Sequence, residues 1–185
     1  MRIVGGHFRG RALKGPSNQT IRPTSDRLRE SLFNILEHAY GDPVRDARVI
    51  DVFAGTGALA LEALSRGAHF ALLIDDDSQA QALIRSNIAT LDLAAQTRIL
   101  SRSALKIGTA PLGEKFALAF LDPPYHGNLA IAALGALRDG AWLAAGALVV
   151  VEDAANARMD LPEEFKMVET RLSGESQLAF LRFGD

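Results

Sequence analysis

The chain has 185 residues, of which 48% are hydrophobic and 23% charged, and its net charge is −2. These values are typical of one globular domain with a hydrophobic core, and they argue against a generally basic nucleic-acid binder. Because there is no cysteine, disulfides and thiolate metal sites are excluded, and we expect no metal site. The sequence has no signal-peptide core and no run of apolar residues long enough to cross a bilayer, so we expect a cytoplasmic protein without membrane contact.

The first 25 residues contain basic side chains and no acid. The five basic residues are Arg2, Arg9, Arg11, Lys14 and Arg22, which leaves 15 basic against 22 acidic residues in the remainder. Two short runs flank Gly5-Gly6 and predict a β-hairpin or bent ribbon over residues 1–15. We therefore treat residues 1–22 as a basic ribbon that steers a polyanion, and residues 23–185 as the main domain. A solvated N-terminus explains the charges about equally well.

A helix is expected next, and then strands alternate with helices. Thr24 or Ser25 is placed to cap the first helix, Ser78 is placed to cap a later one, and a turn of helix follows Ser103. Strands are expected at 48–53, 69–75, 97–101, 116–121 and 146–152, helices at 57–66, 78–90 and 128–138, and a final pair of strands at 165–172 and 177–183.

The near-continuous apolar strands predict parallel strands that are buried on both faces. Together with the alternating helices they predict an α/β fold, a doubly wound, Rossmann-like sheet of seven mostly parallel strands with an antiparallel hairpin at its C-terminal edge. Ligands of such sheets bind beyond the carboxyl ends of the strands, at the topological switch. Four polar residues lie at or just past predicted strand ends: Asp51, Asp75, Ser103 and Asp122. Core packing does not require acids there, so we predict a ligand site.

The first of these acids opens the motif Asp51-Val52-Phe53-Ala54-Gly55-Thr56-Gly57. Gly55 and Gly57 have no Cβ, so a ligand can approach the backbone, and Asp51 can hold a cationic group. The motif also fits an ordinary turn between a strand and a helix. It is not the G-x-G-x-x-G of dinucleotide sites, and it lacks the lysine of a phosphate-binding loop. A ligand with ribose and adenine but no pyrophosphate fits better, and S-adenosylmethionine is such a ligand.

Asp75 ends the second strand and begins a run of three acids. An acid at this position accepts hydrogen bonds from ribose hydroxyls in nucleotide sites. Asp76 stays a second candidate for the cofactor, although a helix N-terminal acid favoured by the helix dipole is the competing interpretation. For Asp77 we prefer that competing interpretation.

A second motif, Asp122-Pro123-Pro124-Tyr125, follows the strand expected at 116–121. The prolines remove two backbone donors, so the Asp122 carboxylate and the Pro123 carbonyl can act as acceptors in one pocket. Hydrogen bonds from an exocyclic base amine to these acceptors orient the amine for in-line attack on a methyl group. Tyr125 offers a ring on which an extruded base can stack. Alone, the motif also fits a strand-to-loop turn; its place after the fourth strand favours the catalytic interpretation.

The two motifs together resemble the amino-group methyltransferases that use S-adenosylmethionine. Further motifs extend the resemblance to the RsmD family over nearly the whole chain: Arg2-Ile3-Val4-Gly5-Gly6, Arg9-Gly10-Arg11, Arg22-Pro23-Thr24, Asp26-Arg27, Arg29-Glu30, Leu32-Phe33-Asn34, Ala58-Leu59 and Glu62-Ala63-Leu64-Ser65-Arg66-Gly67-Ala68. These are bacterial enzymes that methylate a guanine N2 amine of 16S ribosomal RNA in a small-subunit assembly particle. The resemblance therefore implies that reaction and that partner. No extended apolar stripe is left over, so we expect a monomer.

The resemblance also implies roles for the matched positions. The methionine end of the cofactor would lie against Asp51, Phe53, Ala54, Gly55 and Gly57, with Asp122 beside it. Asp75 would bind the ribose, where the family more often has Glu, and residues 122–125 would hold the guanine. RNA contacts would come from Arg2, Arg9, Arg11 and Lys14, with Arg22 and Thr24 near the mouth of the site.

The chain departs from the family at Ser103, where an acid usually precedes Ala104 and would accept from the adenine amino group. Serine can still accept through its hydroxyl, and the Ala104 amide can contact adenine, so weaker cofactor affinity is expected. Two alternatives stay open. One is an adenine-N6 methyltransferase acting on DNA or RNA, although 185 residues leave little room for a target-recognition region. The other is a non-catalytic RNA-binding assembly factor, which only Ser103 favours.

Overall fold

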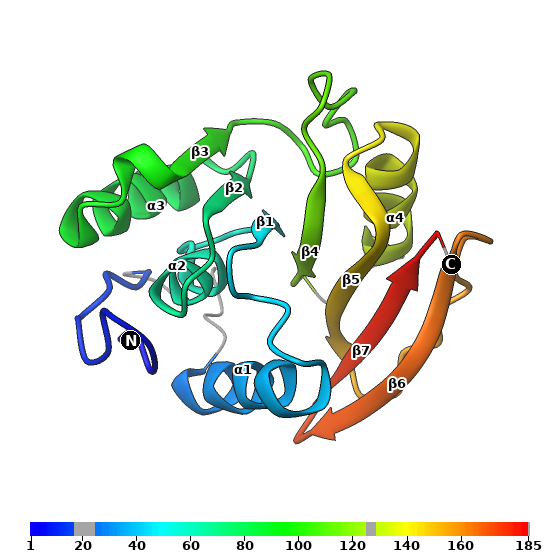
Figure 1. Cartoon of the computed structure of the whole chain (residues 1–185), viewed down its shortest axis with the longest axis horizontal. Coiled ribbons are helices and arrows are strands. Elements are labelled where there is room, and N and C mark those ends of the chain that lie inside the picture. The colour runs from blue at the N-terminus through cyan, green and yellow to red at the C-terminus, as the bar shows by residue number, and fades with distance from the viewer. Residues whose placement is uncertain (17–24, 125–128, 185) are drawn as a thin grey trace.

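The computed structural model describes residues 1–16, 25–124 and 129–184. The elements in chain order are α1 (Asp26–Ala39), β1 (Arg48–Val52), α2 (Ala58–Ser65), β2 (Phe70–Ile74), α3 (Ser78–Leu91), the 3₁₀ turn η1 (Ala94–Gln96), β3 (Thr97–Leu100), β4 (Phe116–Leu121), α4 (Leu129–Asp139), β5 (Leu143–Ala154), β6 (Phe165–Ser173) and β7 (Ser176–Phe183). The strands form one seven-stranded sheet (Figure 1). The expected α/β architecture is therefore confirmed.

The sheet has the strand order β3-β2-β1-β4-β5-β7-β6. Strands β3, β2, β1, β4 and β5 are parallel, whereas β7 is antiparallel to both of its neighbours, β5 and β6. The chain moves outward from β1 to β2 and β3, then crosses to β4 on the other side of β1. The topological switch thus lies between β1 and β4, and the expected C-terminal edge hairpin is confirmed.

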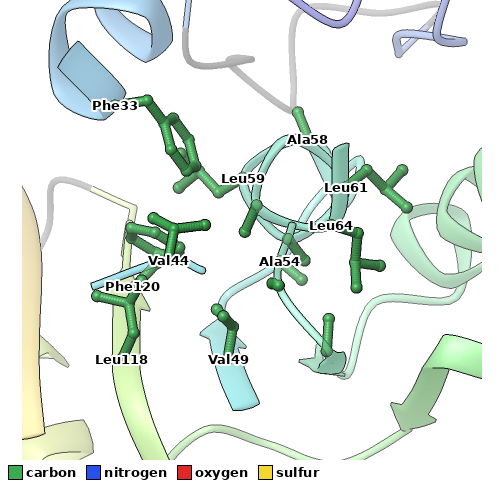
Figure 2. Packing of buried hydrophobic residues seen from close by; sticks show 14 of the residues in the cluster. Phe33, Val44, Val49, Ala54, Ala58, Leu59, Leu61, Leu64, Leu118 and Phe120 are labelled. Carbon is green, nitrogen blue, oxygen red and sulfur yellow. The ribbon is translucent and has the colours of Figure 1, made fainter. Parts of the chain in front are cut away.

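The two faces of the sheet carry separate cores. On one face Val49, Leu118 and Phe120 meet apolar side chains of α1 and α2, among them Phe33 and Leu59 (Figure 2). The opposite face, which includes Ile50 and Leu121, is covered by α4. The alternation follows from the pleat of the strands, since successive side chains point to opposite faces. Within the three described ranges, no helix is both long and apolar enough to cross a membrane.

Apart from shifts of one or two residues at element ends and the unexpected turn η1, the local structure differs from the sequence expectations in three features. The N-cap of α3 is Asp77, whose carboxylate accepts from the Ala80 N–H at 2.8 Å, so Ser78 is the first helical residue and not the cap. After Ser103 the chain makes a single hydrogen-bonded turn, because only the Lys106 N–H reaches the Ser103 carbonyl, at 2.9 Å. Strand β5 is longer than expected at both ends, because β4 pairs with it at Leu143 and β7 pairs with it as far as Ala154. Ser25 caps α1, accepting from Leu28.

The N-terminal segment is a reduced form of the expected ribbon. Its two runs are joined by one isolated antiparallel bridge, between Arg2 and Ala12, and not by two regular strands. Ile3 and Leu13 are buried in the core between the sheet and the first three helices. This segment, residues 1–14, is called the arm below. The arm packs tightly on the main domain, and the division at residue 22 stays a prediction because residues 17–24 lie outside the described ranges.

Candidate active site

Three acids lie at the carboxyl ends of three neighbouring strands. Asp51 is the second-last residue of β1, Asp75 directly follows β2, and Asp122 directly follows β4. The strands are in register, since Val52 pairs with Ile74 on one side and with Leu121 on the other. The structure therefore brings together the acids that the sequence placed at separate strand ends, and it does so at the topological switch.

Asp51 is the most buried of the three, with 1% of its surface exposed. One carboxylate oxygen, Oδ2, accepts a hydrogen bond from the Ala60 N–H in the first turn of α2, at 3.1 Å. Burial raises the pKa of Asp51 well above its ordinary value, and the negative charges of Asp122 and Asp75 raise it further, while the Ala60 hydrogen bond lowers it. An ionised carboxylate in this position is stabilised by a cationic ligand.

Asp75 is half-buried and is tied to the turn after β1. Its Oδ2 accepts from the Gly55 N–H at 2.8 Å and its Oδ1 from the Asp77 N–H at 2.9 Å. Burial raises the pKa of Asp75, and these two hydrogen bonds partly oppose the shift. Each carboxylate oxygen has a second lone pair, so the group can still accept from ribose hydroxyls. Asp76 is exposed, and Asp77 serves as the cap of α3.

The turn between β1 and α2, residues 53–57, is called the glycine turn. Its backbone is left-handed at Phe53, Gly55 and Gly57, with φ of 64°, 56° and 77°. The positive φ favours glycine at position 57, and a Cβ there would lie 2.9 Å from Leu73 Cδ2, so a larger residue would also displace that side chain. The reason expected from the sequence, approach of a ligand to the backbone, stays a prediction. Phe53 holds a conformation that costs a non-glycine residue on the order of 1–3 kcal/mol, as is common at ligand sites. Ala54, held by its N–H bond to Ile74 O at 3.0 Å, is buried beside it.

Ser103 and Ala104 follow β3 on the same edge of the sheet. The last residue of β3, Leu100, accepts from the Asp75 N–H at 3.4 Å, which places this segment next to the β2 end. Ser103 is half-buried, and its hydroxyl accepts from the Leu105 N–H at 3.4 Å. Ala104 is 6% exposed. The serine thus stabilises its own turn and keeps a second lone pair for a ligand.

The second motif begins where β4 ends. Asp122 is half-buried, and its N–H lies 3.4 Å from the Val52 carbonyl at the end of β1. Pro123 is buried and Pro124 is exposed, whereas Tyr125 lies outside the described residues. The negative charge of Asp122 raises the pKa of Asp51, as expected for acids at the ends of two paired strands.

The arm runs along α2, and its first residue contacts the turn between β1 and α2. Near its start, Met1 Sδ lies 3.8 Å from Thr56 Oγ1 in the glycine turn. At its tip, the His7 N–H donates to the Ser65 carbonyl at 2.7 Å, at the far end of α2. The expected RNA-binding side chains Arg2, Arg9, Arg11 and Lys14 are all exposed. Two others, Arg22 and Thr24, lie outside the described residues.

Sequence reasoning missed the side chains that hold the arm in place. Glu62 Oε2 accepts from the Val4 N–H at 2.8 Å, and Ser65 Oγ accepts from the Phe8 N–H at 2.9 Å and donates to the Gly5 carbonyl at 2.6 Å. A signal existed, because these are the two polar residues of an otherwise apolar helix that is buried throughout. Asn87 gave the same signal, since it falls on the buried face of α3.

The carboxylates at the strand ends fit S-adenosylmethionine. A buried carboxylate of raised pKa suits a cation, and a second carboxylate with open lone pairs suits a ribose. In the part of the chain that the structure describes, no group of three or more His, Cys, Asp or Glu side chains is arranged to hold a metal ion. The arrangement can therefore bind a cationic nucleoside and present an acceptor, Asp122, to a second ligand.

Comparisons with known proteins agree with this geometry. The family model described as Conserved hypothetical protein 95 matches residues 1–182. Ribosomal RNA small subunit methyltransferase D of Escherichia coli (strain K12) is 38% identical over 176 residues, which cover 95% of this chain and 86% of that protein. The protein of the same name from Haemophilus influenzae is 33% identical, with 94% and 89% covered.

A solved structure, the yhhF protein of Escherichia coli, superimposes with a TM-score of 0.85 at 34% identity, covering 100% of this chain and 98% of that one. Over this extent, both the sequence and the arrangement of the sheet are shared with the relatives. The chain therefore belongs to the RsmD family of class I methyltransferases, whose methyl donor is S-adenosylmethionine.

Proposed function

We propose that this protein transfers a methyl group from S-adenosylmethionine to the exocyclic N2 amine of a guanine in 16S ribosomal RNA, within a small-subunit particle. The observation that carries the proposal is the convergence of Asp51, Asp75 and Asp122 at the ends of three adjacent strands, next to the switch point. The relatives named as ribosomal RNA small subunit methyltransferases support the choice of substrate.

The cofactor would lie across the ends of β1, β2 and β3. Bound there, it supplies a methyl group carried on a positively charged sulfur. Asp51 would offset the positive charge of the methionine end, and the strained turn at Phe53 and Ala54 would shape that part of the pocket. Asp75 would accept from the ribose hydroxyls, while Ser103 and Ala104 would contact the adenine.

The target base would lie against the end of β4. Asp122 and the Pro123 carbonyl would accept hydrogen bonds from the two hydrogens of the amine. This contact holds the nitrogen lone pair toward the methyl group, and the proton released on transfer can leave through the Asp122 carboxylate. Orientation of this kind contributes several kcal/mol to a bimolecular transfer. Tyr125, as a stacking surface for the base, stays a prediction.

The arm would contribute the sequence-independent contacts to RNA. Its basic side chains are exposed along the length of α2, a helix of eight residues, or about 12 Å. Because Lys14 is at the end nearest the glycine turn and Arg9 is near the tip, the RNA backbone would follow α2 away from the site. Contacts to phosphates position the substrate without selecting its sequence.

Labelled S-adenosylmethionine, incubated with the protein and small ribosomal subunits from cells that lack the enzyme, tests the proposal. The RNA is then digested to nucleosides. Label in N2-methylguanosine is the expected result. Label in N6-methyladenosine would keep the chemistry and overturn the substrate, and absence of label despite measurable subunit binding would favour the assembly-factor alternative.

A further inference from the structure

Asn87 is a fully buried polar residue of α3 that no step described so far uses. Its Oδ1 accepts from the Lys14 N–H at 2.7 Å, and its Nδ2 donates to the Lys14 carbonyl at 3.0 Å. The same Nδ2 donates to the Thr56 carbonyl at 2.9 Å. One amide side chain therefore binds both backbone groups of an arm residue and one backbone group of the glycine turn.

The two segments that Asn87 joins have different tasks in the proposed reaction. Lys14 is the last residue of the arm, which carries the exposed basic residues. Thr56 lies between Gly55 and Gly57 in the glycine turn. The turn is further fixed by Asp75, through the Gly55 N–H. A displacement of the arm at Lys14 thus acts on a carbonyl only one residue away from the atom that Asp75 holds.

We propose that Asn87 is a positioning residue that couples the arm to the glycine turn. As a result, RNA bound by the arm and cofactor bound by the turn each strengthen the binding of the other. The inference rests on the proposed function, since it takes the arm as the RNA contact. The coupling arises because the arm and the glycine turn are both hydrogen-bonded to the Asn87 side chain. When the first ligand orders one of these segments, the other becomes more ordered too, so the second ligand loses less conformational entropy on binding. By linkage the effect is equal in both directions.

Two variants break the link in different ways. Asn87→Ala removes all three hydrogen bonds. Asn87→Asp keeps the size and the acceptor for the Lys14 N–H but loses the Nδ2 donor, and it places a carboxylate against the Lys14 and Thr56 carbonyls. The control is Ser65→Ala, which loosens the tip of the arm at Phe8 and Gly5 without touching the glycine turn.

The measurement is the dissociation constant for small subunits, with and without saturating S-adenosylhomocysteine, in wild type and the three variants. Melting curves select the variants that fold. For wild type and Ser65→Ala, we expect the dissociation constant for subunits to be at least about five-fold lower when the nucleoside is present, which is within the range of known couplings. Both Asn87 variants are expected to show less than about a two-fold difference.

Hydrogen exchange of residues 54–57, measured on the free protein, gives a readout that needs no RNA. Faster exchange of this turn in the Asn87 variants, but not in Ser65→Ala, is expected. A wild-type coupling factor near one, or equal coupling in the Asn87 variants, would overturn the inference. If subunits do not bind the wild type at all, the proposed function fails instead. The Asn87 link is then tested by hydrogen exchange alone, and unchanged exchange of residues 54–57 in the Asn87 variants would overturn it.

Discussion

The Oδ2 atom of Asp75 accepts a hydrogen bond from the Gly55 N–H at 2.8 Å, so an acid at the end of β2 holds the turn that follows β1. With its other oxygen bound to the Asp77 N–H, this carboxylate also fixes the entry to α3. The proposed ribose site and the proposed methionine site therefore share one side chain, and a change at Asp75 is expected to disturb both.

Asp75→Asn should weaken S-adenosylmethionine binding by about ten- to a hundred-fold, because hydrogen bonds to a charged group contribute about 1.5–3 kcal/mol. Gly55 and Asp77 donate to different oxygens of Asp75, and the amide replaces one of these oxygens with an NH2 group, so one of the two hydrogen bonds is lost. Calorimetric titration of the cofactor measures the loss. Asp92→Asn is the matched control, since Asp92 is exposed and lies at the C-terminal end of α3, away from the strand ends that form the candidate site. Equal losses in the two variants would remove Asp75 from the ribose site.

Asp51→Asn should stabilise the free protein at neutral pH. Burial raises the folded-state pKa of Asp51, so the folded chain binds more protons than the unfolded chain, and this carboxyl lowers stability as pH rises from its ordinary pKa to the raised one. Removing the charge is expected to raise the unfolding free energy by about 1–3 kcal/mol, or several degrees in Tm. The gain should shrink as the pH is lowered, and a pH-independent difference would contradict the assignment.

The same group should make cofactor binding depend on pH. Because a cationic ligand favours the ionised carboxylate, binding releases a proton where Asp51 is protonated in the free site. We expect the affinity of the wild type to rise with pH through the raised pKa, and the affinity of Asp51→Asn to be lower and flatter. Calorimetry in buffers of different ionisation enthalpy counts the released protons. Release from the variant equal to that from wild type would assign the proton to another group.

Ser103→Asp should bind the cofactor about five- to ten-fold more tightly if its carboxylate reaches the adenine amino group, since a charged acceptor is stronger than a hydroxyl. An aspartate can keep the bond to the Leu105 N–H that the serine now accepts, so the turn is preserved. Ser101→Asp adds the same charge at an exposed position two residues away and serves as control. Unchanged affinity in Ser103→Asp would place residue 103 outside the pocket.

Replacing Arg2, Arg9 and Arg11 with Ser should weaken subunit binding and flatten its salt dependence. Each phosphate contact contributes about 0.7–0.9 to the slope of log affinity against log salt, so losing three contacts lowers that slope by roughly 2–3. The triple variant Arg45, Arg158 and Arg171 to Ser removes the same charge from exposed positions outside the arm. If both triple variants lower the slope equally, the arm is not the RNA contact.

The sequence predicted the sheet, its edge hairpin and the acids at the strand ends, because those features follow from local patterns: apolar runs, glycines and the residue that ends each run. The anchoring of the arm could not be predicted in this way. Its hydrogen bonds to α2 and α3 join residues 57 to 73 positions apart, such as Phe8 with Ser65 and Lys14 with Asn87. Such pairs depend on how α2 and α3 pack, which no single segment encodes.

The role of individual glycines could be predicted only in part, for the same reason. Gly5 and Gly6 were expected to make a turn, but they also let the arm touch the end of α2: a Cβ on Gly6 would lie 1.9 Å from the Ser65 carbonyl oxygen, and one on Gly5 would meet the Arg66 guanidinium. A sequence pattern identifies a glycine that matters. Only the packed neighbour shows whether turn geometry, close packing or a ligand requires it.

The role of Asp122 in the transfer is tested by measuring methyl transfer and cofactor binding of Asp122→Ala on the same preparation. We expect the rate to fall by about 10²- to 10³-fold or more, as when one hydrogen-bond partner of a reacting group is removed, and the cofactor affinity to stay within about three-fold of wild type. Asp122→Asn, which keeps one acceptor oxygen, should retain more activity than the alanine variant. Wild-type turnover by Asp122→Ala would show that the acid at the end of β4 has no part in the transfer.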